Sequence, residues 1–509
     1  MKRTALISLI LLSGSLSLSG QDTLQVSRRV RQELDPVLHI GTDATEAHSA
    51  AAFLFSPLPT LVDASLGFQY RDEEVPSVMQ EGDGLMEGAF RAHAFRRLSE
   101  ADAVQGGATY RRGVRRNVRW NNTSDFDLLF PYVTADSVGG DLQTETYAFY
   151  GKYARRAGKF FWGAEGDYRA CHEYRTVDPR PRNITSDFTV HLTGGLVLGS
   201  YAADLSAAYR RYHQQQSVEY VNPLGAKAPQ LHLTGLGSHY ARFQGSGAYL
   251  NTRYRGNGYS LSAGVRPVGT GGVSAGGSYT LFDAVQHLVN QNEAPFTELR
   301  LQDVKAYAGW RSDPGAWHEG VEAGFSYRLR EGMERVIDNV ATGIYDDIYT
   351  LSMYHGRTWE GSLKGAVTRE SAGTSLSLMP RLEYFRENFD HRFPERKLAY
   401  SHLEGELGVR WIRVRGRWTA LAGGGWAYRK ALGGEYLIPA EYTLENLLAA
   451  YAGEYAVLTD GAHTFSANLR LAREMGRGTA GYLDLSGSLV RYGRGFRTLQ
   501  GGLTIGFNF

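Results

Sequence analysis

The chain contains 509 residues, of which 42% are hydrophobic, 12% aromatic and 21% charged, with 61 Gly and a formal net charge of +2. An average chain of this length holds about 36 Gly, at roughly 7% usage, so the excess favours tight turns and close strand packing and excludes a helix bundle. The one cysteine, Cys171, excludes an intramolecular disulfide and any thiolate-rich zinc or iron–sulfur site.

Residues 1–20 have the pattern of a secretory signal peptide, because two basic residues precede an apolar stretch that ends in small residues. Cleavage there removes Lys2 and Arg3 but no acidic residue, which leaves 53 basic and 53 acidic residues. A neutral mature chain lacks the basic excess that nucleic-acid binding normally needs. We therefore expect an exported protein with no nucleic-acid partner.

Residues 21–61 form an N-terminal extension that shows no sustained alternation of apolar and polar side chains. Residues 26–38 have mixed charge and could form a short helix, whereas residues 53–59 are apolar and interrupted by proline. Forty residues suffice for a small constriction or plug strap inside a barrel. A loose periplasmic tail is the alternative, and the pattern does not decide between them.

Residues 62–509 are dominated by a period of two, in which apolar side chains alternate with polar ones. The alternation is cleanest in residues 499–509, and residues 321–330 and 399–411 show it as well. Predicted turns rich in Gly, Asn and Asp are residues 255–258, 312–315, 459–461, 476–478 and 493–495. The segments are long enough to cross a bilayer as tilted strands. The predicted fold is all-β, a transmembrane antiparallel β-barrel of about 20 strands, between 18 and 22.

The last residue, Phe509, ends an amphipathic strand and resembles the sorting signal of bacterial outer-membrane barrels. It predicts the outer membrane as location, with membrane lipid, lipopolysaccharide and the barrel-assembly machinery as partners. Counting back from Phe509 in the periplasm puts the tight turn at 493–495 outside and a longer connection at 431–441 inside. That order reverses the usual asymmetry of such barrels, so the count splits or merges a strand near residues 436–448.

Two irregular segments interrupt the strands. Residues 117–140 could fold inward and narrow the pore, or could lie on the surface with their cations against lipid phosphates. Residues 178–183 read Asp-Pro-Arg-Pro-Arg-Asn, a stiff extended connector with two guanidinium groups. The candidate lumen or constriction residues are Arg115, Arg116, Trp120, Asn121, Asp125, Asp136, Asp178, Arg180 and Arg182.

Five strings carry a resemblance to a known family: WNNTSDF at 120–126, PYVTADSVGGD at 131–141, ETYAFYGKYA at 145–154, YRACHEYRTVDPRPRN at 168–183 and LTGLGSHYARF at 233–243. They are similar to outer-membrane barrels from Bacteroidota that are catalogued only as a domain of unknown function. The resemblance implies an outer-membrane barrel in an anaerobic Gram-negative host and no established substrate. Relatives carry Asn-Pro-Ala near the first strand, where this chain has Ser56-Pro57-Leu58, and this departure weakens the expectation of an inner plug.

No arrangement of residues predicts catalysis. Ser401 and His402 are adjacent, and adjacent residues of an extended chain point to opposite faces. The same holds for Asp346 with Asp347 and for Asp390 with His391. The fourteen histidines are scattered, without metal-ligand spacing on one face. We therefore predict no enzymatic activity, no cofactor and no metal site.

The interior of a barrel of about 20 strands cannot be filled by its own side chains, and the predicted lumen carries charges of both signs. The leading hypothesis is a passive channel or substrate-specific transporter of unknown substrate. A second is a sealed barrel that serves as anchor or export partner of a surface protein. A third is FadL-like uptake of hydrophobic substrates through a lateral gap between strands. Convergence of Arg115, Arg116, Arg180 and Arg182 in the lumen would favour an anionic solute.

Overall fold

The computed structural model describes residues 26–224, 228–247, 250–337, 347–476 and 478–509. The predicted signal peptide at residues 1–20 lies outside these ranges and stays a prediction. In the described ranges, no helix is both long and apolar enough to cross a membrane.

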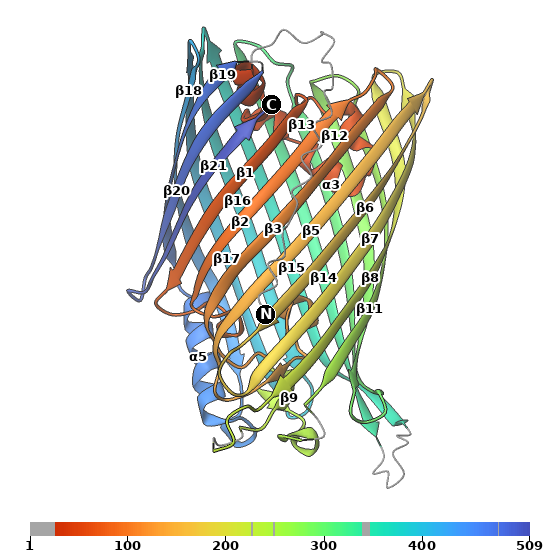
Figure 1. The fold of residues 1–509 in the computed structure, drawn as a ribbon, viewed down its shortest axis with the longest axis vertical. Helices are drawn as coiled ribbons and strands as arrows, with labels where there is room; N and C mark the ends of the chain where they lie inside the picture. The colour runs from red at the N-terminus through yellow and green to blue at the C-terminus, as the bar shows by residue number, and fades with distance from the viewer. Residues whose placement is uncertain (1–25, 225–227, 248–249, 338–346, 477) are drawn as a thin grey trace, which may run out of the picture.

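In the described residues, 18 antiparallel strands form one closed barrel (Figure 1). The strands are β1 (Leu61–Glu73), β2 (Gly84–Arg97), β3 (Asp102–Val118), β5 (Gly140–Ala157), β6 (Phe160–Tyr174), β7 (Arg180–Leu198), β8 (Tyr201–Glu219), β11 (Thr252–Pro267), β12 (Gly272–Leu288), β13 (Ala294–Arg311), β14 (Trp317–Ile337), β15 (Asp347–Ser371), β16 (Thr374–His391), β17 (Arg396–Arg415), β18 (Trp418–Leu437), β19 (Ala462–Gly476), β20 (Thr479–Tyr492) and β21 (Arg497–Asn508). The first strand closes the ring against the last, with Leu66 opposite Ile505. The predicted all-β transmembrane barrel is confirmed, at the lower end of the expected strand number.

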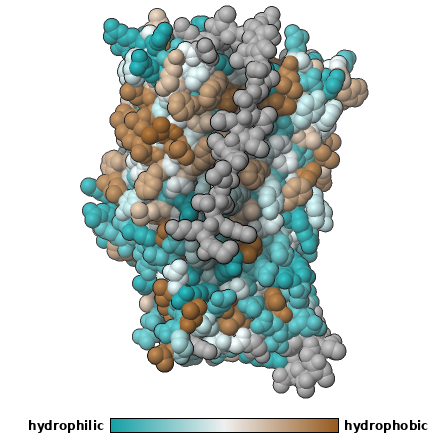
Figure 2. Space-filling view, in the orientation of Figure 1, coloured by the Kyte–Doolittle hydropathy of each residue, from teal (hydrophilic) through white to brown (hydrophobic). Residues whose placement is uncertain are grey.

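The period of two places apolar side chains outside and polar ones inside. On β21, Leu503, Ile505 and Phe507 are exposed on the outer surface, whereas Thr498 and Asn508 on the other face are buried. Figure 2 shows the exposed apolar residues gathered in the upper half of the barrel, while its lower half is mainly hydrophilic. This apolar band is the surface that a membrane-spanning barrel presents to lipid.

The two ends of the barrel differ in the length of their connections. Connections such as residues 158–159, 199–200 and 416–417 are tight and meet at the upper end in Figure 1, which we call the turn end. The opposite, loop end carries the long connections, including those at residues 119–139 and 220–251. Phe509 lies at the turn end, where its amide donates to the Val62 carbonyl at 2.9 Å.

The connection predicted at residues 431–441 is wrong. Strand β18 continues to Leu437, and the true connection, residues 438–461, contains the 3-10 helix η4 (Ala440–Tyr442) and helix α5 (Glu445–Leu458). This connection lies at the loop end, as does the tight turn at 493–495, so the usual asymmetry holds (Figure 1). Gly434, inside the predicted connection, allows close packing, because a Cβ there would lie 2.7 Å from the Tyr455 hydroxyl.

The turn predicted at residues 255–258 is also wrong, because these residues lie inside β11. Gly256 and Gly258 face the lumen wall opposite the Phe282 ring, and a Cβ on Gly256 would lie 2.5 Å from that ring. The glycines therefore make space for an aromatic side chain. Residues 312–315 do connect two strands, as predicted.

The N-terminal extension lines the inside of the barrel at the turn end. We call residues 26–60 the N-terminal belt. Its helices are α1 (Val26–Glu33), α2 (Pro36–His39), α3 (Thr42–His48) and the 3-10 helix η1 (Ala52–Phe55). These contact the wall in reverse strand order: α1 meets β20, β19 and β17, α2 meets β15 and β14, α3 meets β12 and β11, and η1 meets β5 and β3. The belt thus follows most of the circumference before the chain enters β1.

Hydrogen bonds to inward-facing side chains hold the N-terminal belt along this path. The Ser27 amide donates to Glu474 at 3.0 Å, the Gly41 amide to Glu322 at 2.9 Å and the Ala50 amide to Thr193 at 2.9 Å. Wall cations bind belt carbonyls in the same way, as Arg410 does with Leu34 at 2.6 Å. The described part of the extension is therefore attached to the lumen wall rather than being a loose tail.

The loop end is filled by three connections that fold into the lumen. This lumen plug comprises residues 119–139 with α4 (Phe126–Leu129) and β4 (Thr134–Ala135), residues 230–243 with β9 (Leu231–Gly235), β10 (Ser238–His239) and η3 (Ala241–Phe243), and residues 438–461. Its three short strands form a sheet in the order β10-β9-β4. The short helix η2 (Met79–Glu81) contacts it from the β1–β2 connection.

An apolar core joins the lumen plug to one side of the barrel. Its buried members include Trp120, Leu129, Val133, Leu231, Leu447 and Tyr451 from the plug and Tyr212, Tyr254, Phe282, Leu299, Tyr354 and Leu398 from the wall. The wall members come from β8, β11, β12, β13, β15 and β17. The plug also makes polar contacts with the wall on β6, β7 and β8, and on β14 and β17, where Arg330 and Arg396 donate to plug carbonyls.

Candidate functional site

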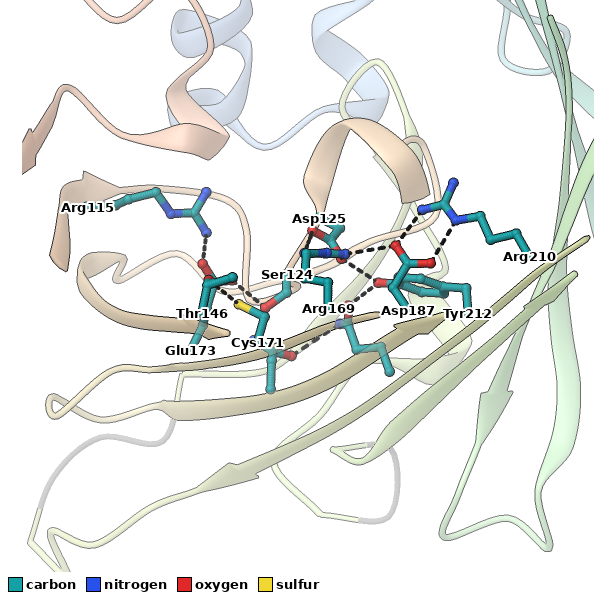
Figure 3. Close-up of polar contacts among 12 residues, drawn as sticks. Arg115, Ser124, Asp125, Thr146, Arg169, Cys171, Glu173, Asp187, Arg210 and Tyr212 are labelled. Atoms are coloured by element: carbon teal, nitrogen blue, oxygen red, sulfur yellow. Dashed lines mark hydrogen bonds and ion pairs between the residues drawn. The ribbon is translucent and has the colours of Figure 1, made fainter. Parts of the chain in front are cut away.

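The polar side of the lumen plug is centred on Asp125, a candidate constriction residue. Asp125 adopts a left-handed backbone conformation (φ 53°) at the start of α4. Its carboxylate accepts two hydrogen bonds from Arg169 of β6, at 2.9 and 2.7 Å, and one from the Tyr212 hydroxyl of β8 at 2.9 Å (Figure 3). Such two-pronged guanidinium–carboxylate pairs are strong and directional, so Asp125 fixes residues 119–139 against the wall.

A second carboxylate extends this network along the wall. Asp187 of β7 binds Arg210 of β8 through two hydrogen bonds, at 2.8 and 2.7 Å, and also accepts one from Arg169 at 3.3 Å. Figure 3 shows the two guanidinium groups on either side of Asp187. Two arginines thus face two aspartates, and the network carries no net charge toward the lumen.

Glu173 on β6 links the plug to strand β3. One of its carboxylate oxygens accepts a hydrogen bond from Arg115 of β3 at 2.8 Å, and the other accepts one from Ser124 of the plug. Next to it, the Thr146 hydroxyl lies 3.5 Å from the Cys171 sulfur (Figure 3). Arg115 therefore faces the lumen as predicted, but as the partner of a carboxylate.

A buried ion pair joins two of the strings that carry the family resemblance. Asp136, at the end of β4, pairs with Arg175 of the β6–β7 connection, and both side chains are almost fully inaccessible to solvent. Asp136 also accepts hydrogen bonds from the Val138 and Gly139 amides, at 2.8 and 2.9 Å, and Arg175 donates to the Pro179 carbonyl at 2.8 Å. This ion pair therefore holds the ADSVGG and RTVDP segments together, and we call it the clasp.

Trp120 and Asn121 also lie inside the barrel. Trp120 belongs to the apolar core and has a left-handed backbone (φ 56°). The Asn121 side-chain amide donates to the Gln80 carbonyl at 3.0 Å, and its oxygen accepts from the Thr123 amide at 2.8 Å. Of the nine candidate residues, the structure brings Arg115, Trp120, Asn121, Asp125 and Asp136 into the plug or onto the wall beside it.

The other four candidates lie elsewhere, so Arg115, Arg116, Arg180 and Arg182 do not converge in the lumen. Arg116 follows the inward-facing Arg115, so it points outward, where it pairs with Asp72 and lies over the Tyr70 ring. Arg182 is also outside, and donates to His172 at 3.1 Å. An anionic-solute site made of these arginines is therefore excluded.

Asp178 and Arg180 form a loop-end contact outside the lumen. The Arg180 guanidinium donates to Asp178 at 2.6 Å, and the amides of Val221 and Asn222 donate to the same carboxylate at 2.9 and 2.6 Å. The Asn222 amide and the Arg180 charge lower the pKa of Asp178. This contact ties the β6–β7 and β8–β11 connections together.

Two buried amide side chains of the wall bind the plug and were not predicted. Asn183 of β7 and Gln216 of β8 both donate to the Asn122 carbonyl, at 2.9 and 2.7 Å. Gln216 also accepts from the Thr134 hydroxyl at 2.8 Å. The run Gln214-Gln215-Gln216 within a strand is the sequence feature that points to them, because amide side chains buried inside the barrel need hydrogen-bond partners.

Glu454 of α5 is buried where the plug meets η2. It accepts a hydrogen bond from the Met79 amide at 2.7 Å and has no cation within ion-pair distance among the described residues. Burial raises the pKa of Glu454 to about 8, against the opposing effect of the Met79 hydrogen bond. The carboxyl is therefore largely protonated at neutral pH. The Tyr132 hydroxyl of the plug is also buried, and its pKa is raised well above the usual value.

In the described part of the lumen, two cavities have polar and charged side chains in their lining. One, of about 520 Å³, is bounded by β1 and β19–β21; its inward side chains include Gln69, Arg71, Ser466, Asn468, Ser486, Ser488, Gln500 and Thr504. The other, of about 710 Å³, lies between the N-terminal belt and the wall and is lined by charges of both signs, including Glu33, His39, Lys364, Arg381 and Arg410. An apolar depression of about 810 Å³ is formed by outward residues such as Leu196, Leu205 and Ala263.

Histidines, cysteines and carboxylates are dispersed in the described part of the barrel. In the ranges that the structure covers, no three His, Cys, Asp or Glu side chains are close enough to hold a metal ion. Asp346, which the sequence analysis considered together with Asp347, lies outside the described residues. His402 stacks on Phe385 inside the barrel, with ring centroids 5.1 Å apart.

Several solved structures are similar to the chain in fold. The outer membrane transporter YddB from Escherichia coli is 8% identical, and the match covers 87% of this chain and 81% of that chain with a TM-score of 0.37. A mutant of the ferric enterobactin receptor PfeA from Pseudomonas aeruginosa is 8% identical, with coverages of 87% and 80% and a TM-score of 0.37. The ferric preacinetobactin receptor BauA from Acinetobacter baumannii is 9% identical, with coverages of 88% and 80% and a TM-score of 0.40. No curated protein matches the chain in sequence.

One family model matches residues 50–509, which include the whole barrel, the plug and the last part of the N-terminal belt. Its description is "Family of unknown function (DUF6850)". The match agrees with the expected family of unknown function, while the expected bacterial host stays a prediction. The chain therefore belongs to this family of unknown function, DUF6850.

Proposed function

We propose that the protein is an outer-membrane transporter for a small polar solute, with a lumen that is closed at the cell exterior by the plug and opens when the plug moves. The observation that carries this proposal is the pair of polar cavities of about 520 and 710 Å³ in the lumen. Both volumes fall in the range of small-molecule sites. A barrel with a purely structural role has no need for such cavities.

The apolar band and the terminal Phe509 support the outer membrane as location. With Phe509 in the periplasm, the turn end and the N-terminal belt face the periplasm, and the plug faces the cell exterior, which is the usual asymmetry of bacterial barrels. Phe509 is exposed beside β1, where the assembly machinery can bind the last strand. Membrane lipid and lipopolysaccharide surround the band.

The lining of the cavities favours a neutral or zwitterionic solute. The cavity beside β19–β21 presents hydroxyl and amide groups, with Arg71 as its charged inward side chain. The cavity beside the belt balances Glu322 and Glu406 against Lys364 and Arg381. Mixed charges and hydrogen-bonding groups suit a sugar or amino-acid-sized molecule better than an ion of one sign.

The polar side of the plug is suited to act as the moving surface. Ion pairs such as Asp125–Arg169 are partly solvent-accessible, so water can replace their hydrogen bonds when the plug retracts. Opening an interface of this kind costs less than separating an equally large apolar one. The plug can therefore separate first from its polar contacts on β6–β8.

Conductance in planar bilayers tests the proposal. Asp125→Asn weakens the plug's contact with Arg169 and should increase the open probability well above that of the wild-type protein. The matched control is Asp484→Asn, which removes a 3.1 Å ion pair with Arg470 on the wall between β19 and β20. The control should open no more often than wild type. Equal silence of all three folded barrels would refute a gated transporter.

A sealed anchor or export partner is the second candidate, favoured by the apolar core that joins the plug to six wall strands. It predicts no conductance even after Asp125→Asn, together with a surface protein that co-purifies in mild detergent. FadL-like uptake is less well supported, since every neighbouring pair of strands is hydrogen-bonded in the described part of the ring. The apolar depression also faces outward rather than into the lumen.

A further inference from the structure

A cluster of basic side chains lies on the outer surface of three neighbouring strands. This cationic patch consists of Arg211 and His213 on β8, Arg253 and Arg255 on β11, and His287 on β12. The sheet register puts His213 opposite Arg255 and Arg253 opposite His287. His213 also lies within electrostatic range of Arg211, Arg253 and Arg255. Five groups that are or can become cationic thus share one small area.

The side chains of the patch point away from the lumen. On β8 and β11 the alternate residues Tyr212, Gln214 and Tyr254 are buried inside the barrel. Neighbours on adjacent positions of a strand point to opposite faces, so Arg211, His213, Arg253 and Arg255 are outside. The patch is therefore separate from the polar cavities and from the plug.

The patch has fewer acidic partners than cations. Arg253 and Arg255 share one carboxylate, Glu293, which Arg255 binds at 2.7 Å. Arg211 donates to the neutral Asn257 side chain at 2.6 Å. Several other outer cations pair with a carboxylate of their own: Arg116 with Asp72, Arg300 with Asp283 and Arg497 with Glu74. The patch thus has spare positive charge for an anion.

The height of the patch coincides with the edge of the apolar band. Tyr209 and Tyr259 are exposed, with ring centroids 5.5 Å apart. Tyr209 lies two positions before Arg211 on β8, and Tyr259 lies two positions after Asn257 on β11. Farther toward the turn end, Leu205 and Leu261 are about two-thirds exposed (71% and 67%). Exposed tyrosines mark the headgroup level of a membrane. A lipid beside these strands therefore presents its headgroup to the cationic patch.

We propose that the cationic patch binds the phosphate groups of a phosphorylated glycolipid in the outer leaflet. Guanidinium groups bind phosphate oxygens in a planar, two-pronged geometry, and three arginines lie here on two neighbouring strands. The partner is a lipid because the leucines beyond the tyrosines can hold its acyl chains. This proposal rests on the outer-membrane orientation proposed above, but not on transport.

Native mass spectrometry of the full-length protein in detergent tests the proposal. The probes are a bisphosphorylated lipid A and the same lipid with its phosphates removed, each added at increasing concentration. The wild-type protein should bind the phosphorylated lipid at least about tenfold more tightly. The triple variant Arg211→Gln/Arg253→Gln/Arg255→Gln should bind both lipids equally weakly. Heat-modifiable migration on gels verifies that each variant is folded.

A matched triple variant, Arg386→Gln/Lys397→Gln/Arg497→Gln, removes three cations from the outer surface of β16, β17 and β21. It should keep the wild-type preference. An equal loss in this control, or unchanged binding in the patch variant, would overturn the proposal. Displacement of the lipid by millimolar inorganic phosphate would also overturn it, because it would indicate a site for the free anion. Loss of conductance with retained lipid binding would count against the transporter alone.

Discussion

Replacing Glu454 by glutamine should remove a pH dependence from the attachment of the lumen plug. Glu454 is buried in α5, and its one hydrogen bond within the described structure comes from the Met79 amide at 2.7 Å. Its pKa is raised from 4.5 to about 8 by burial. When the plug opens, water reaches the carboxyl and its pKa returns toward 4.5.

The direction of the effect follows from proton binding. Between pH 4.5 and 8 the closed plug keeps the Glu454 proton while the opened plug has lost it, so the opened form binds fewer protons. Closure of the plug is therefore most stable at low pH and weakens as pH rises through this window. A shift of one pKa unit corresponds to about 1.4 kcal/mol, so the full loss is roughly 4 to 5 kcal/mol, complete above about pH 8.

Glutamine keeps an oxygen for the Met79 amide and cannot ionise. Its NH₂ group adds a buried donor, which costs about 1 to 3 kcal/mol if it finds no acceptor. Glu454→Gln should therefore be slightly less stable than wild type at pH 5. At pH 9 the order should reverse, because the wild-type carboxylate is then charged in an apolar site.

Hydrogen exchange of the α5 amides, measured by mass spectrometry from pH 5 to 9, checks this expectation. The ratio of variant to wild-type rates at each pH cancels the intrinsic pH dependence of exchange. The ratio should fall as pH rises and cross unity between the extremes. Glu445→Gln, an exposed change in the first turn of the same helix, should give a constant ratio. A constant ratio for Glu454→Gln would refute the reasoning.

Two further substitutions test the clasp and the belt. Arg175→Met leaves Asp136 buried without its cation, which should cost about 3 to 5 kcal/mol and expose residues 119–139 to protease. Adding Asp136→Leu removes the unpaired charge and should restore protection. If protection is not restored, the unpaired charge is not the cause of the loss. Gly163→Leu puts a Cβ 2.6 Å from the Ala50 carbonyl, so it should release residues 50–60 to protease while the barrel stays folded. Gly166→Leu, where a Cβ meets nothing within 4 Å, is its control, and equal cleavage in both would count against the contact.

The barrel was predictable because its signal is local. Alternation of apolar and polar side chains, as in Leu503 and Thr504, identifies a strand with one apolar and one polar face even when its neighbouring strands are unknown. Errors arose where glycine has two uses. Gly256 and Gly434 resemble turn residues, but each instead leaves room for an aromatic side chain. Helix α5 was missed because its sequence, ENLLAAYAGEYAVL, is apolar on most sides and shows no helical period.

The plug was predictable only in part, because long-range contacts define it. Asp125 and Asp136 were singled out by their irregular segment, but their partners Arg169 and Arg175 lie about 40 residues away. The same segment gave no reason to choose Gln216, which binds Asn122 across 94 residues. The misplaced Arg116 has another cause. Arg115 and Arg116 are adjacent, and adjacent residues of a strand point to opposite faces, so only one of them can face the lumen.

The two closures of the lumen differ in a way that indicates which one must move. The N-terminal belt contacts successive strands around the ring, from β20 back to β3, so its path follows the wall rather than crossing the axis of the barrel. The plug instead joins connections from opposite sides of the ring, because Met79 after β1, Leu233 after β8 and Leu447 after β18 share one core. In the transporter that we propose, the belt lies beside the path of the solute and the plug lies across it. Regulation of passage would then belong to the Asp125, Asp136 and Glu454 contacts.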